Sequence, residues 1–107
     1  MTATLYPHSE LVACYDRLSH ALTELAAAIR GSELPIWLPL TDSEAASGLT
    51  AREKAVQLYC DIWYLDGQDG RVTRSCHGLI GADDNIIEFC ELANAAKLEF
   101  RQAVKAV

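Results

Sequence analysis

The chain has 107 residues, a length typical of one domain, and none of its segments has the composition of an interdomain linker. Half of its residues are hydrophobic and 22% are charged, which is ordinary for a folded protein and argues against disorder. The net charge is −6, with six acidic and two basic residues between positions 41 and 70. This balance works against general binding of DNA or RNA, because such binding depends on neutralising phosphates.

The first eight residues contain neither the basic nor the apolar region of a secretory signal, and no apolar run approaches the roughly 20 residues that span a bilayer. We therefore expect a cytoplasmic protein that makes no use of a membrane. The cysteines fit that compartment, since they form no C-x-x-C pair and cysteine often acts as a small buried apolar residue. They are Cys14, Cys60, Cys76 and Cys90. Their even number leaves a disulfide framework open, but we expect thiols.

The first predicted helix begins around Pro7 or Ser9 and stops at Gly31. Six apolar residues in it recur at alternating spacings of four and three, which places them on one stripe of a helix. They are Leu11, Tyr15, Leu18, Leu22, Leu25 and Ile29. Another element has to cover this stripe.

Residues 31–40 form a connector that cannot continue the helix, because Pro35 and Pro39 each lack a backbone donor and disfavour helical backbone in the preceding residue. The connector is unusually apolar for a loop. Its apolar residues are Leu34, Ile36, Trp37, Leu38 and Leu40. Either it folds back as a lid on the protein's own helices, or Trp37 anchors a partner.

Two capping boxes follow the connector. Thr41-x-x-Glu44 opens a short helix that ends at Gly48, and Thr50-x-x-Glu53 opens a longer one to about Leu65. The longer helix is apolar around much of its circumference. Its apolar residues are Ala55, Val56, Leu58, Tyr59, Ile62, Trp63 and Leu65. We expect it to be the central, most buried helix, or to show one face to a partner.

Residues 66–70 are predicted to form a turn, and residues 71–81 to contain at most one helical turn. The last predicted helix begins near Gly81, with Asp83 and Asp84 in its first turn, where carboxylates complement the helix dipole. Its apolar residues lie on two adjacent stripes. The first is Ile86, Cys90, Ala93, Phe100, Val104 and Val107, and the second is Phe89, Leu92, Ala96 and Ala103.

No strand pattern competes with these helices, so the predicted fold class is all-α, in a single helical domain over residues 1–107. We expect a small antiparallel bundle of three main helices plus one or two short helices. The Pro-rich apolar connector is expected to pack across it.

The best candidate for catalysis is Cys76 beside His77, and it is a poor one, because adjacent residues on an extended chain point in different directions. No set of histidine, cysteine and acidic residues has the spacing of a metal site. We therefore expect no enzymatic activity, no metal and no cofactor. An enzyme that uses Cys76 and His77 is kept as an alternative.

A second alternative is a DNA-associated accessory factor of replication or transcription. Lys97, Arg101 and Lys105 recur every four residues on the last predicted helix, and Arg71 and Arg74 could join them in space. Basic residues near a helix end more often complement its dipole, so nucleic-acid binding is not expected.

The leading hypothesis is a regulatory module that binds another protein and inhibits it. We expect more apolar surface than a bundle of this size can bury, and self-association or partner binding would cover the excess. The predicted partner-binding residues are Ile36, Trp37, Leu38 and Leu40, then Tyr59 and Trp63.

A short acidic chain with the Leu11–Ile29 stripe, the Trp37 segment and no catalytic motif resembles the small helical antiactivators of bacterial quorum sensing. That resemblance implies a homodimer that binds a LuxR-type transcription factor and blocks the factor's dimerisation. It implies no individual site residue, because the resemblance lies in overall character. Small inhibitors encoded by phages and plasmids share the same character.

Overall fold

The computed structural model describes residues 2–33, 35–65 and 84–106, with side chains of the first helix described from residue 9 onward. These residues contain no strand and form four helices, which confirms the all-α class. The helices are α1 (Thr2–Gly31), α2 (Asp42–Ala46), α3 (Ala51–Tyr59) and α5 (Asp84–Ala106). Within the described ranges, none of them is both long and apolar enough to cross a bilayer.

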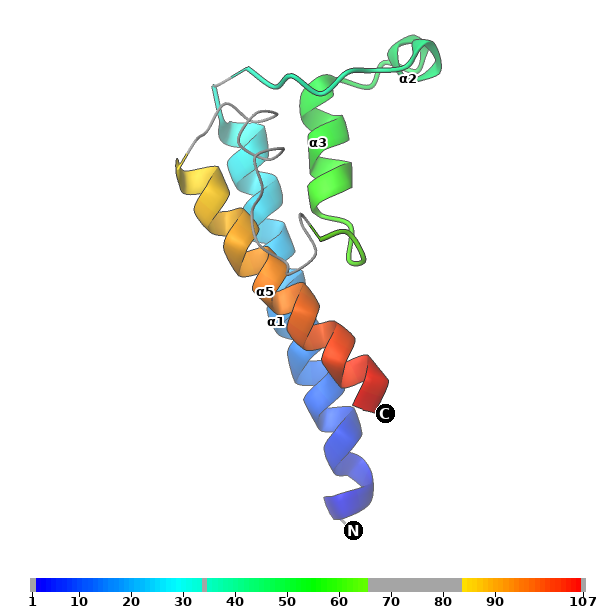
Figure 1. Ribbon diagram of the computed structural model, residues 1–107, viewed down its shortest axis with the longest axis vertical. Helices are drawn as coiled ribbons and strands as arrows, with labels where there is room; N and C mark the ends of the chain where they lie inside the picture. The colour runs from blue at the N-terminus through cyan, green and yellow to red at the C-terminus, as the bar shows by residue number, and fades with distance from the viewer. Residues whose placement is uncertain (1, 34, 66–83, 107) are drawn as a thin grey trace.

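Helix α1 is the longest of the described helices and extends along most of the molecule. Its 30 residues correspond to about 45 Å at 1.5 Å per residue, against a longest dimension of 53 Å. Helix α5 runs antiparallel along α1, so that both chain ends lie at the same end of the molecule (Figure 1). Helix α3 packs against the C-terminal half of α1, where α5 also packs. The expectation that the Thr50 helix would be central is therefore wrong, because α1 is the helix that packs against both others.

The hydrophobic core lies where α1, α3 and α5 meet. Its buried residues are Leu25, Ile29, Ala55, Val56, Tyr59, Ile86, Cys90 and Ala93. The predicted stripe of α1 is covered unevenly: Leu18, Leu25 and Ile29 are buried, whereas Tyr15 is exposed. Towards the N-terminus the stripe is thus only partly covered, since Leu11 is half-buried and Tyr15 is exposed.

Helix α1 starts earlier than predicted. It begins at Thr2 and includes Pro7, which removes one backbone hydrogen bond near the start of the helix. Its end at Gly31 agrees with the prediction. The loss of one hydrogen bond is small against the packing of the rest of α1 on α5, so the helix continues through Pro7.

The two capping boxes differ in outcome. At α2 the Thr41 hydroxyl accepts from the Glu44 N–H and the Glu44 carboxylate accepts from the Thr41 N–H, as predicted. At α3 the Thr50 hydroxyl accepts from the Glu53 N–H, at 3.1 Å. The Glu53 carboxylate, however, accepts from the Arg30 guanidinium at 2.7 and 3.0 Å. The second box is thus half formed, because its glutamate is used to join α3 to α1.

Helix α3 ends at Tyr59, six residues before the predicted end at Leu65. Beyond it, the Asp61 carboxylate accepts a hydrogen bond from the Trp63 N–H at 2.7 Å. An aspartate side chain that captures an N–H two residues on favours a turn over another helical hydrogen bond. Residues 60–65 therefore leave the helix axis, and Trp63 is carried to the surface.

Candidate protein-binding surface

Lys97 joins α5 to the end of α3 from inside the protein. Its side chain is 1% exposed, and its ammonium donates to the main-chain carbonyls of Tyr59 and Tyr64, each at 2.7 Å. The Tyr59 carbonyl belongs to the last residue of α3, where a cation complements the negative end of the helix dipole. The ammonium also lies 5.7 Å from the centre of the Tyr64 ring. Burial lowers the pKa of Lys97 below its usual range, since burial disfavours the charged form.

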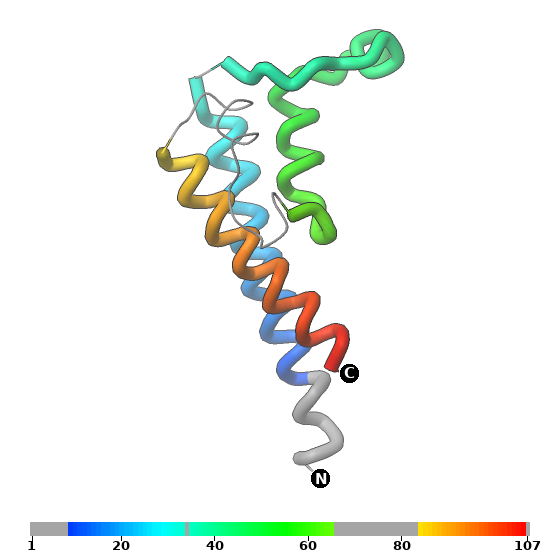
Figure 2. Tube along the Cα trace, viewed as in Figure 1, coloured from blue at the N-terminus to red at the C-terminus, as the bar shows by residue number. Residues whose placement is uncertain are grey.

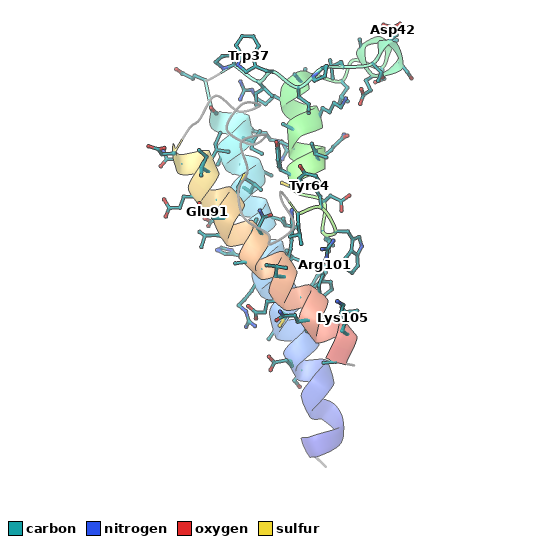
Figure 3. The ribbon with its side chains drawn as sticks, viewed as in Figure 1. Trp37, Asp42, Tyr64, Glu91, Arg101 and Lys105 are labelled. Carbon is teal, nitrogen blue, oxygen red and sulfur yellow. The ribbon has the colours of Figure 1, made fainter. Side chains whose placement is uncertain are left out.

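Arg101, four residues after Lys97 on α5, contacts the same segment that follows α3, residues 60–65. Its guanidinium donates to the Trp63 carbonyl and lies 5.6 Å from the centre of the indole ring (Figure 3). A guanidinium over an indole face is an attractive cation–π contact. Lys97 and Arg101 together therefore fix the backbone of residues 59–64 and set the position of the Trp63 ring.

Three rings form an exposed cluster across α1, the turn after α3 and α5. The Phe100 ring lies 5.8 Å from the Tyr15 ring and 6.0 Å from the Trp63 ring, measured between centroids. Trp63 is 56% exposed and Tyr15 is 48% exposed. We call Tyr15, Trp63 and Phe100 the aromatic surface. Phe100 is half-buried between the two exposed rings, and exposed tryptophan and tyrosine rings are typical of the anchors of protein interfaces.

A shallow groove of about 490 Å³ continues from the aromatic surface along α1. Tyr15 and Ile62 lie at the boundary of the two, and Leu18, Leu22 and Ala26 form much of the apolar floor. Arg30 lines the groove as well, and its guanidinium is paired with Glu53. The groove thus offers an apolar floor beside the exposed rings.

The predicted partner-binding residues of the connector divide between its two faces. Trp37 is 67% exposed, whereas Ile36 and Leu38 are half-buried and pack against the core. Leu40 is half-buried. The lid and the anchor are therefore not alternatives, since the connector covers the bundle with one face and presents Trp37 on the other (Figure 3).

The two other predicted residues differ in the same way. Trp63 is exposed and belongs to the aromatic surface, whereas Tyr59 is 3% exposed and belongs to the core. The assignment of Tyr59 to a partner is wrong, because its ring packs edge-on against Tyr64, at 5.6 Å, inside the protein. Trp37 and Trp63 are not brought together. Trp37 lies near the C-terminal end of α1, whereas Trp63 lies against Arg101, further towards the opposite end of the molecule (Figure 3).

Sequence reasoning missed Tyr15 and Phe100 as surface residues. Both occupy apolar stripes, which predict burial, and nothing in a helical pattern says where a third helix stops. In the structure α3 covers one half of α1, and the half that holds Tyr15 is left to α5 (Figure 2). Asp61 could have indicated the exposed half from the sequence. An aspartate that favours a turn predicts an earlier end of α3, and a shorter α3 covers less of α1.

The basic stripe considered for DNA contact does not form. Lys97 is buried and binds carbonyls, and Arg101 is engaged with Trp63. Lys105 is exposed near the end of α5. The other basic residues of that hypothesis, Arg71 and Arg74, lie outside the described residues. Phosphates therefore have access to Lys105 but not to an ordered row of three cations.

The cysteines seen in the described ranges, Cys14, Cys60 and Cys90, are joined by no disulfide. Burial raises the pKa of the Cys60 thiol, and burial together with Glu99 raises that of Cys14, so both favour the less reactive protonated form. Among the same residues no group of histidine, cysteine and acidic side chains could hold a metal. Cys76 and His77 lie outside the described residues.

We predict that Lys97→Met lowers the free energy of unfolding by about 2 kcal/mol. The substitution keeps an unbranched side chain, one heavy atom shorter, but removes the ammonium that donates to the carbonyls of Tyr59 and Tyr64. Lys105→Met is the control, since an exposed lysine of the same helix should change stability by less than about 0.5 kcal/mol. Urea unfolding at neutral pH measures both. Equal effects of the two substitutions would show that the buried ammonium does not hold the turn.

The sequence matches no protein-family model, and no curated protein or solved structure is significantly similar to it. The comparisons therefore assign the chain to no family. What it does has to be inferred from the arrangement of its own side chains.

Proposed function

We propose that the chain is a regulatory module that binds another protein through the aromatic surface of Tyr15, Trp63 and Phe100. The observation that carries this proposal is the exposed Trp63 ring, which Arg101 and Lys97 hold at the surface instead of in the core. Tryptophan, tyrosine and arginine are the residues that most often dominate binding energy at protein interfaces. Fixing the turn before a partner arrives also reduces the entropy lost on binding.

The finer proposal is that binding inhibits the partner, and that the partner is a LuxR-type transcription factor whose dimerisation is blocked. Its support is the resemblance to quorum-sensing antiactivators, together with an apolar surface that could occupy a dimerisation surface of similar character. The alternative of an enzyme that uses Cys76 and His77 stays a prediction. The alternative of a DNA-associated factor loses support with the burial of Lys97.

We expect the aromatic surface to be required for partner binding. Trp63→Ala should weaken binding by roughly 30-fold or more, since loss of an interface anchor costs about 2 kcal/mol or more. Tagged protein is used for pull-down from its native cell lysate under reducing conditions, and the recovered partner is then purified for titration. Glu91→Ala, at an exposed position of α5, is the matched control. A partner that binds the Trp63→Ala and control variants equally well would remove the aromatic surface from the proposal.

The same experiment tests the finer proposal. If the recovered protein is a LuxR-type factor, size-exclusion chromatography of the factor with increasing amounts of this chain should show its dimer replaced by a mixed complex. A factor that stays dimeric while binding the chain would contradict inhibition by blocked dimerisation. Recovery of nucleoid or replication proteins that disappear after nuclease treatment would favour the DNA-associated alternative instead.

We also propose a homodimer, formed through a second groove between α1 and α5. This groove has a volume of about 590 Å³, and its apolar lining includes Ala21, Phe89 and Leu92. Leu92 is 55% exposed beside the other apolar residues of this lining. The lining also carries Arg17, which is paired with Glu99 in the same chain, and the carboxylates of Asp16 and Glu24, so the support for self-association is the apolar part of the groove.

We predict that Leu92→Glu shifts the protein towards the monomer in sedimentation velocity. A carboxylate in the middle of an apolar self-contact would be desolvated without a partner. Gln102→Glu adds the same charge at an exposed position of α5 and should leave the sedimentation coefficient unchanged. A dimer that survives Leu92→Glu would exclude this groove, and a wild-type protein that is monomeric at high concentration would exclude the homodimer.

A further inference from the structure

The connector between α1 and α2 has the side-chain pattern of a β-strand, although it pairs with none in the described structure. Exposed and half-buried residues alternate strictly along it. The exposed ones are Pro35, Trp37 and Pro39, and the half-buried ones are Ile36, Leu38 and Leu40. A period of two is that of extended backbone, in which neighbouring side chains point to opposite faces. The trace over these residues runs from the end of α1 towards α2 without forming a helix (Figure 1).

The two edges of this extended segment differ in hydrogen-bonding capacity. In a strand, the N–H and C=O of one residue point to one edge, and those of the next residue point to the other. The edge that holds residues 35, 37 and 39 has one N–H, that of Trp37, because proline has none. The Pro39 carbonyl on this edge accepts from the Lys54 ammonium at 2.7 Å. This edge therefore faces α3 and is poor in donors.

The opposite edge keeps all of its donors and acceptors. It holds the N–H and C=O groups of Ile36, Leu38 and Leu40, which recur every two residues, or about every 6.6 Å. Within the described part of the chain, these groups make no hydrogen bond to protein atoms. The segment thus has an edge that can pair with another strand and an edge that proline closes to pairing.

We propose that the Ile36–Leu40 edge binds an extended peptide segment of the partner by β-strand addition. Main-chain hydrogen bonds to Ile36, Leu38 and Leu40 would supply the register, and a side chain beside the exposed Trp37 ring would supply specificity. The segment is flanked by exposed Glu33 and Asp42, so the matching peptide is apolar at alternate positions and basic near its ends. This inference rests on the proposed function, since it names the form in which the protein partner is recognised.

Charge disfavours a second copy of this chain as the occupant of the edge. Antiparallel pairing of two copies centred on Leu38 would place Glu33 of one copy near Asp42 of the other, at both ends of the pair. Asp42 is the first residue of α2, so the repulsion would be between carboxylates that flank the two paired segments. A peptide with lysine or arginine at those positions would gain from the same two carboxylates.

The test uses backbone N-methylation, which removes a donor and keeps the side chain. The full chain can be assembled by ligation at Cys60, with N-methyl-Leu38 as the variant and N-methyl-Trp37 as the matched control on the opposite edge. The probe is a set of ten-residue peptides selected against the wild-type protein from a random displayed library. N-Methyl-Leu38 should weaken peptide binding at least tenfold, whereas N-methyl-Trp37 should change it less than twofold. Helical circular dichroism checks that both variants fold.

Amide hydrogen exchange supplies a second readout that does not depend on a variant. Peptide binding should slow exchange at Ile36, Leu38 and Leu40 at least tenfold and leave Trp37 unchanged. Selection of no peptide with basic ends, equal binding to both N-methylated proteins, or protection of Trp37 would each overturn the inference. Self-pairing would appear instead as protection of the same three amides in the wild-type protein at high concentration, without peptide, and would likewise overturn it.

The failure of this inference can be separated from failure of the proposed function. Selected peptides should bind Trp63→Ala protein as tightly as wild type, because Trp63 lies on a different part of the surface. Loss of peptide pairing with retained dependence on Trp63 would sink the strand-addition inference alone. Retained pairing with no dependence of the whole partner on Trp63 would sink the aromatic surface alone.

Discussion

The buried ammonium of Lys97 is the contact on which the arrangement of the surface depends. The ammonium donates both to the Tyr59 carbonyl at the end of α3 and to the Tyr64 carbonyl. It therefore fixes the end of α3 relative to the segment that follows this helix. A charged group is costly to bury, and this one is compensated by two carbonyls, a helix end and an aromatic ring. Without it, the turn that carries Trp63 would still contact α5 through Arg101 and through the Phe100 ring, both at the surface end of the turn.

The second constraint is the unequal length of the helices. Helix α1 spans nearly the whole molecule, whereas α3 covers one half of it, so the other half is a layer of two helices (Figure 2). Two packed helices bury one stripe each and leave their remaining apolar side chains to solvent or to a partner. Tyr15, Val12 and Val104 are exposed for this reason. The proposed protein-binding function follows from the same geometry, since a partner would supply the missing cover.

Local sequence patterns predicted well which residues form helices. They predicted poorly how the helices pack and which of their side chains are buried. The α2 capping box and the stop at Gly31 depend on residues close in sequence, and both agree with the structure. The end of α3 depends on Asp61 and on Lys97, which lies 38 residues from Tyr59. A lysine in a row with Arg101 and Lys105 predicts a solvated face, and only the packing of three helices shows that it is buried. The same limit placed Tyr59 on the surface and Tyr15 in the core.

Acrylamide quenching of Trp63 fluorescence tests most directly whether the aromatic surface is open in the isolated protein. The chain has two tryptophans, so Trp37→Phe leaves Trp63 as the dominant emitter. The account predicts a quenching rate constant close to that of a solvent-exposed tryptophan in dilute protein, and a clear decrease when the partner binds. A rate constant typical of a buried tryptophan in the dilute, isolated protein would mean that the chain covers this surface itself, and would contradict the account.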